Sequence, residues 1–96
     1  MAQFLKRPGT EYEYINSDAT TQIHEGECIL HRIVINGGTL TGTITIIDGT
    51  DGSTANVATI AANQVGGTVY EYNAQMSSGL RIITSAAVDI TVVYQV

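Results

Sequence analysis

Short runs rich in Ile, Val, Thr and Tyr alternate with clusters of Gly, Asn, Asp and Ser along the chain from Glu11 onward. β-branched and aromatic side chains favour extended backbone, whereas the residue types of the clusters favour turns. Several runs alternate apolar and polar positions with a period of two, as half-buried strands do. In the last run, one side consists of Val88, Ile90, Val92, Tyr94 and Val96. The pattern contains no clear helical segment and predicts an all-β domain.

The spacing of the turn clusters predicts seven or eight strands in one domain of this 96-residue chain. Turns that recur about every 8–12 residues are typical of a sandwich or a barrel. We expect an antiparallel β-sandwich over residues 11–96, with a jelly roll as one option, and an N-terminal arm over residues 1–10. The expected strands span residues 11–16, 20–24, 28–36, 39–48, 57–62, 67–73, 80–85 and 88–96.

The arm differs in character from the rest of the chain. A Pro-Gly pair at positions 8 and 9 separates it from the first strand. It could be a terminus without fixed structure, as termini often are. Alternatively, it could bind a partner and become ordered there, for example by adding a strand to an open sheet edge. The candidate partner-binding residues are the two apolar and two cationic side chains Phe4, Leu5, Lys6 and Arg7.

The most apolar run spans residues 28–36. Strict alternation places Ile29, Ile33 and Ile35 on one face, and Cys28, Leu30 and Val34 on the other. Apolar side chains on both faces predict a central strand that is covered on both sides or lies at a subunit contact. The Asn-Gly-Gly sequence at 36–38 predicts a hairpin to the strand at 39–48, because Asn and Gly tolerate positive φ. Gly42, inside that strand, predicts a bulge or a bend.

The charge is distributed unevenly. Residues 11–96 carry only Arg32 and Arg81 against nine carboxylates, a formal charge of −7. An acidic body argues against nucleic-acid binding, which needs basic surface to neutralise phosphates. No run approaches the ~20 apolar residues of a membrane span, and the first residues lack the pattern of a secretory signal. We therefore expect synthesis in the cytoplasm and neither a nucleic-acid nor a membrane partner.

Candidate reactive side chains are few. Cys28 is the only cysteine, so an intrachain disulfide is excluded and a small buried hydrophobe is the simplest interpretation. His24, Glu25, Glu27 and His31 lie within eight residues, but they form neither a His-x-His pair nor a His-Glu-x-x-His helix. We expect His31 to be partly buried and hydrogen-bonded, and no metal site here.

The loop sequence Asp-Gly-Thr-Asp-Gly-Ser at 48–53 has a density of oxygen ligands that calcium could use. The complete EF-hand pattern is absent, and Asp-Gly pairs are common in turns, so we favour a turn and leave metal binding open. No serine lies in a nucleophile elbow, and no pair among the carboxylates stands out for glycoside hydrolysis. The sequence therefore predicts no enzyme, no catalytic residue and no cofactor.

The tyrosines form two pairs at i and i+2, Tyr12 with Tyr14 and Tyr70 with Tyr72, and each pair falls on one face of a strand. Such pairs can pack on a core with their hydroxyl groups reaching water. They can also stack on sugars, although the chain has no Trp. A third possibility is a protein interface, in which Tyr is enriched.

Four segments carry a resemblance to a known group of proteins. They are ILHRIVIN at 29–36, GTITIIDGT at 42–50, SGLRIITS at 78–85 and DITVVY at 89–94. The chain resembles small β-sandwich proteins encoded among tailed-bacteriophage structural genes, in which these segments read LHRIVVN, GTITIYDGT, GLTVVTS and DLTVVY. The resemblance covers residues 28–94, and it brings no catalytic residue with it.

The resemblance implies a structural protein of the virion. Some small β modules of this sort are capsid decoration (cement) proteins, and others lie at the neck or tail. We expect a decoration protein on the outer capsid surface that binds junctions between subunits of the major capsid protein. A homo-oligomer is expected, with a trimer as the first guess, because such junctions are often threefold. The alternatives are a neck, tail or fibre-attachment protein, or a non-catalytic carbohydrate-binding module.

Overall fold

The computed structural model describes residues 10–51 and 55–96, and within these ranges the chain forms eight strands and no helix. No helix of this part is long and apolar enough to cross a membrane. The strands are β1 (Thr10–Ile15), β2 (Thr20–Glu25), β3 (Cys28–Ile35), β4 (Ile44–Asp48), β5 (Ala55–Ile60), β6 (Val69–Met76), β7 (Gly79–Thr84) and β8 (Ile90–Gln95). The predicted all-β sandwich is confirmed.

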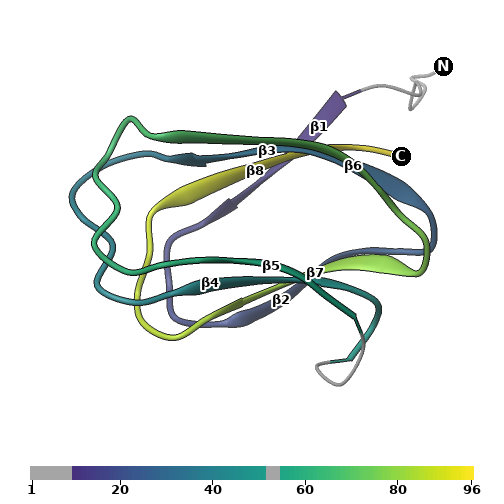
Figure 1. Ribbon diagram of the computed structural model, residues 1–96, viewed down its shortest axis with the longest axis horizontal. Coiled ribbons are helices and arrows are strands. Elements are labelled where there is room, and N and C mark those ends of the chain that lie inside the picture. Colours follow the sequence, from purple (N-terminus) through teal and green to yellow (C-terminus); the bar gives the residue numbers. More distant parts are fainter. Residues whose placement is uncertain (1–9, 52–54) are drawn as a thin grey trace, which may run out of the picture.

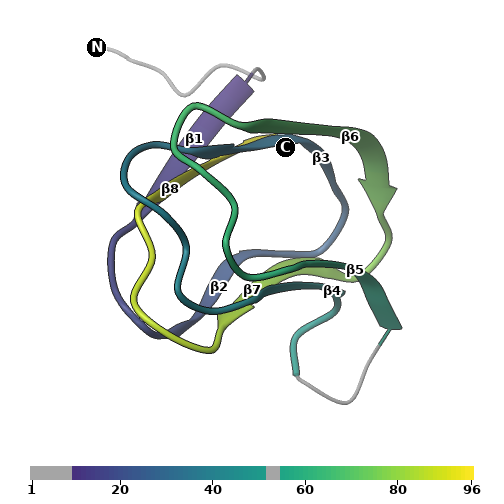
Figure 2. The same ribbon diagram turned by 60° about the vertical axis from the view of Figure 1, so that its left-hand side comes forward.

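The strands form two four-stranded antiparallel sheets. Sheet A has the order β1-β8-β3-β6 and sheet B the order β2-β7-β4-β5. The two sheets face each other, with sheet A above sheet B in Figures 1 and 2. In the described part, β4 and β5 are the only consecutive strands that pair, so every other connection passes between the sheets. This order is that of a jelly roll.

The core lies between the inner faces of the two sheets. Its fully buried side chains alternate with outward ones along each central strand, as the pleat requires. The largest are Leu30, Ile33, Ile35, Ile44, Ile46, Met76, Leu80, Ile82, Ile90 and Val92. Burial of each such side chain stabilises the fold by about 1.5–3 kcal/mol relative to exposure.

A bulge in β3 decides which of its side chains are buried. Leu30 pairs with Tyr94 and Arg32 with Val93, so β3 has one more residue than β8 at this point. The extra residue, His31, breaks the strict alternation of faces. The prediction that Ile29 shares a face with Ile33 is therefore wrong.

The two halves of β3 each alternate as expected, but the bulge joins them out of phase. Cys28, Leu30, Ile33 and Ile35 are buried on the inner face, whereas Ile29 and Val34 are half-buried on the outer face. The predicted central position is confirmed, because β3 pairs with both β8 and β6. Apolar side chains thus remain on an outer face that sheet B does not cover.

The expected hairpin at residues 36–38 does not form. Gly38 has the positive φ of a tight turn, 65°, but β3 belongs to sheet A and β4 to sheet B. Residues 38–40 instead form backbone hydrogen bonds with the connection between β5 and β6. Gly66 N donates to Gly38 O at 2.7 Å, and Leu40 N donates to Gln64 O at 2.9 Å. Contacts with a distant segment therefore override the local hairpin signal.

The strand expected over 39–48 is shorter than predicted, because β4 begins at Ile44. Gly42 lies in the bend before it, which confirms the expected bend. A Cβ at Gly42 would lie 2.5 Å from Ser85 Oγ and 2.8 Å from the backbone nitrogen of Ala86. Only glycine permits so close an approach between these two connections.

Candidate interaction surface

The outward side of sheet A carries the candidate functional site. Three rows of side chains cross its four strands: Tyr14–Thr91–Val34–Val69, Tyr12–Val93–Arg32–Glu71 and Thr10–Gln95–Ile29–Gln75. We call these residues the outer face. Sheet B packs on the opposite side, so none of the described strands covers this one. Several of its apolar members are open to solvent, with exposures of 72% for Tyr12, 51% for Tyr14 and 46% for Val69.

The outer face is electrically neutral. All of its members lie in the described part, and the only charged ones are Arg32 and Glu71. They pair with each other, with Arg32 Nε 3.0 Å from Glu71 Oε2. An exposed pair of this kind contributes little to stability. Its effect is that this face carries no net charge on a chain whose formal charge is −5.

His31, the bulge residue of β3, links three strands on this side of the sheet. Its Nδ1 lies 3.0 Å from Asn73 Oδ1 on β6, and its Nε2 lies 2.9 Å from Gln95 Oε1 on β8. Both nitrogens can donate only when the ring is protonated. The hydrogen bond to Asn73, followed by the one to Gln95, accordingly raises the pKa of His31.

The expectation of a partly buried, hydrogen-bonded His31 is confirmed. Its partners could not be predicted, because both depend on irregular register. Asn73 has a positive φ of 50°. Between the pairs formed by Leu30 and Arg32, β6 has one more residue than β3, so β6 also contains a bulge. Asn tolerates that conformation better than most residues, which is the one sequence signal for this second bulge.

The two tyrosine pairs have different environments. Tyr12 and Tyr14 stand on the exposed outer face, and a hydrogen bond to Asp89 raises the pKa of Tyr14. Tyr70 and Tyr72 are half-buried and pack against the core, and burial raises the pKa of Tyr72. The core-packing interpretation therefore holds for Tyr70 and Tyr72, whereas the interface and stacking interpretations apply only to the first pair.

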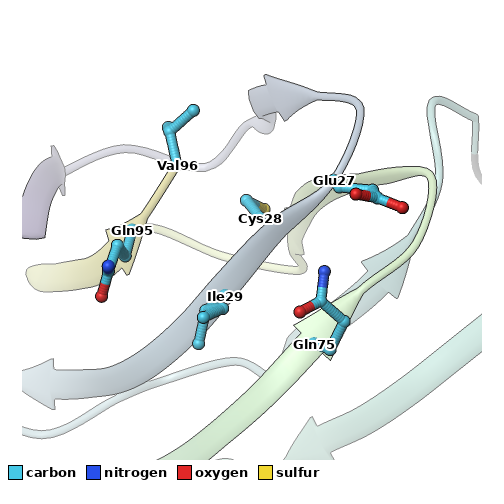
Figure 3. A pocket seen from close by; sticks show the side chains of 6 residues that line it. All are labelled: Glu27, Cys28, Ile29, Gln75, Gln95 and Val96. Carbon is cyan, nitrogen blue, oxygen red and sulfur yellow. The ribbon is translucent and has the colours of Figure 1, made fainter. Parts of the chain in front are cut away.

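A hollow of about 180 Å³ lies where β3, β6 and β8 meet at one end of sheet A (Figure 3). Glu27, Cys28, Ile29, Gln75, Gln95 and Val96 line it. Three of these, Ile29, Gln75 and Gln95, belong to the outer face, so the hollow adjoins that face. It is smaller than the ~300–1,000 Å³ typical of sites for drug-sized ligands. Its size suits a single side chain.

The predicted environment of Cys28 is confirmed, because its side chain is 3% exposed in the core. Burial raises the pKa of its thiol. The two histidines lie on different sheets, with His24 on β2 near the ring of Tyr94, at 6.5 Å between centroids. Among the residues that the structure describes, no group of three His, Cys, Asp or Glu side chains could hold a metal ion.

Asp48 stabilises the turn between β6 and β7. Its carboxylate accepts hydrogen bonds from the backbone nitrogens of Ser77 at 2.9 Å, Ser78 at 2.8 Å and Gly79 at 3.3 Å. The bond from Ser77 lowers the pKa of Asp48 most, burial opposes it, and the bonds from Ser78 and Gly79 bring the net change to a lowered pKa. The first acid of the 48–53 loop thus fixes the turn between β6 and β7, and positions 52 and 53 of that loop lie outside the described residues.

Phe4, Leu5, Lys6 and Arg7, the candidate partner-binding residues of the arm, lie outside the described residues. The structure does place the start of β1: Thr10 pairs with Gln95 at the edge of sheet A. The arm therefore joins the body beside the outer face.

Comparisons with models of protein families, with curated proteins and with solved structures find no match to this chain.

Proposed function

We propose that this protein is a structural component of a tailed-bacteriophage virion, namely a non-catalytic decoration protein on the outer surface of the capsid. The body would bind at junctions between subunits of the major capsid protein. The observation that carries the proposal is the broad, neutral outer face, with Tyr12 and Tyr14 exposed beside half-buried Val34 and Val93. Aromatic and uncharged side chains of this kind are typical of the centres of protein interfaces.

The sequence resemblance supports a location in the virion. The fold is compatible with this location, since jelly rolls recur in viral capsid proteins. In this proposal the arm makes a second contact with the capsid. It joins the body at the edge strand β1, from which Phe4 and Leu5 could bind an apolar site on a neighbouring subunit. Lys6 and Arg7 would meet an acidic patch there. Many copies of such a modest contact would stabilise the head against internal pressure.

Cryo-electron microscopy of particles purified from cells that produce this chain tests the proposal. Regular density on the outer capsid, with the arm on a neighbouring subunit, supports it. Density confined to the neck or tail would establish the alternative of a neck, tail or fibre-attachment protein. Particles free of the chain would refute both.

A binding assay on particles stripped of this protein separates the two contacts. The variant should lack residues 1–9, because Thr10 belongs to β1. We expect weaker binding for this variant, and binding by the full chain that weakens with salt, because charge pairs between exposed groups are screened. A double substitution of Lys6 and Arg7 by alanine should remove the salt dependence alone. Undiminished binding after deletion of the arm would contradict its proposed role.

A further inference from the structure

We infer that two copies of this chain associate through their outer faces, with Tyr12 of each copy seated in the hollow of the other. The inference goes beyond the proposed function, because it concerns the isolated chain in solution, where no capsid occupies the outer face. Three features carry it: an uncovered apolar strand, a face without net charge, and a projecting ring on the same sheet as a hollow large enough for a single side chain.

The first feature is the outer side of β3. Ile29 and Val34 are half-buried on this side although β3 is a central strand without a covering layer in the described part. Val93 on β8 and Val69 on β6 extend the same apolar surface. A central strand that is apolar on both faces is normally covered on both.

The second feature, the absence of net charge on the outer face, favours a second copy of the chain as the partner. Two chains of formal charge −5 repel each other where their acids face, but the three rows of the outer face contain only the Arg32–Glu71 pair, which is internally neutralised. The nearest other acids lie at the margin, Glu27 in the hollow and Asp89 beside Tyr14. A partner recognised by charge would need a charged face here. A second copy needs only a face without net charge, and this one meets that condition.

The third feature is the match between a knob and a hole. Tyr12 is the most exposed large hydrophobic side chain of the described residues, at 72%. The hollow, of about 180 Å³, lies at the end of the same sheet, and three of its six lining residues, Ile29, Gln75 and Gln95, belong to the outer face. Gln95 forms one wall and is held in place by His31 Nε2 at 2.9 Å. Gln75 and Glu27 offer polar partners to a tyrosine hydroxyl inserted there.

A knob and a hole on one flat face define a two-fold axis. The axis must lie in the plane of contact midway between them, which places it along β8 near Val93. Each Tyr12 then meets the partner's hollow, and the contact is the same in both directions, as in an isologous dimer. The overlap covers three strands, roughly 14 Å by 20 Å. This is below the ~800 Å² per partner of stable complexes, so we expect weak association that depends on concentration.

Analytical ultracentrifugation of the full chain from about 10 μM to 1 mM tests the inference. The expected result is a concentration-dependent shift from 10.2 kDa toward twice that mass. Tyr12→Ala removes the knob, and Gln75→Trp fills the hollow from an exposed wall position. Each should weaken association at least tenfold. Val57→Ala, on the exposed edge strand β5 of sheet B, is the control and should leave association unchanged.

Circular dichroism checks that each variant is folded. A chain that stays monomeric to 1 mM, a trimeric mass, or a dimer that neither Tyr12→Ala nor Gln75→Trp weakens would overturn the inference. Capsid binding is measured separately on the full chain: particle binding by a chain that does not self-associate overturns only the dimer, and self-association without particle binding overturns only the proposed function.

Discussion

Substitution of Asp48 by alanine should destabilise the fold from a position outside the hydrophobic core. The carboxylate at the end of β4 accepts three backbone hydrogen bonds from the turn between β6 and β7, about thirty residues away in the chain. Hydrogen bonds to charged groups stabilise by about 1.5–3 kcal/mol each when they are well shielded. Ser77 and Ser78 are exposed, so water competes for this turn, and we expect a total loss of about 2 kcal/mol.

Such a loss corresponds to a fall in Tm of roughly 10 °C for a domain of this size. Asp48→Asn retains one acceptor oxygen but loses the charge, so it should lose about 1 kcal/mol. Urea unfolding followed by far-UV circular dichroism measures both values. Glu25→Gln, at an exposed acid on the end of β2, is the control for a change of charge alone.

The pH dependence gives a second test. The folded state lowers the pKa of Asp48 below 3.8, so its contribution is complete above the unfolded pKa and is lost as pH falls through the folded one. The difference between the wild type and Asp48→Asn should therefore be full at pH 7 and shrink in strong acid. Wild-type stability in Asp48→Ala at pH 7, or a difference that does not change with pH, would refute this account of the turn.

Three further predictions follow from the register and the packing. Urea unfolding should show a loss of about 2–5 kcal/mol for Ile33→Ala and of about 1 kcal/mol for Ile29→Ala. The reason is that the bulge buries Ile33 in the core and leaves Ile29 on the outer face. Equal losses of stability in the two variants would contradict this register. NMR titration should give His31 a raised pKa. Its contribution to the free energy of unfolding should be present below the unfolded pKa and disappear as pH rises through the folded pKa. If the stability of His31→Gln depended on pH as that of the wild type does, this role of His31 would be contradicted. Gly42→Ala should lower stability by about 1–3 kcal/mol, whereas Gly37→Ala, whose Cβ would lie 3.6 Å from Asp89, should be nearly neutral; thermal melts compare them.

The sequence predicts the strands well because each is a short β-branched run between turn residues, and local composition suffices to mark them. It also identifies the buried side of β8, where alternation continues without interruption from Ile90 to Tyr94. The faces of β3 could not be predicted, because the bulge at His31 arises from pairing with a strand about sixty residues away. A period-two pattern contains no information on an inserted residue of this kind.

The candidate surface was only partly visible in the sequence. Apolar residues on both sides of residues 28–36 indicated either a cover or a subunit contact, and the structure leaves their outer side uncovered by the described strands. The interface potential of Tyr12 and Tyr14 could be separated from the packing role of Tyr70 and Tyr72 only in three dimensions. The hollow could not have been predicted, because its walls come from three segments that only the sheet brings together.

The position of β8 between β1 and β3 sets the order in which this protein can fold. Residue 10 pairs with residue 95, and β3 gains its second neighbour in sheet A only when β8 arrives. A ribosome must therefore release residues 90–95 before that sheet can close, and until then β1 has no partner strand in the described part. Pairings between such distant segments are slow to form, on the scale of milliseconds to seconds. During that interval the apolar strands are exposed in the unfinished chain, so yield on expression should depend on the rate of folding and on chaperones as well as on final stability.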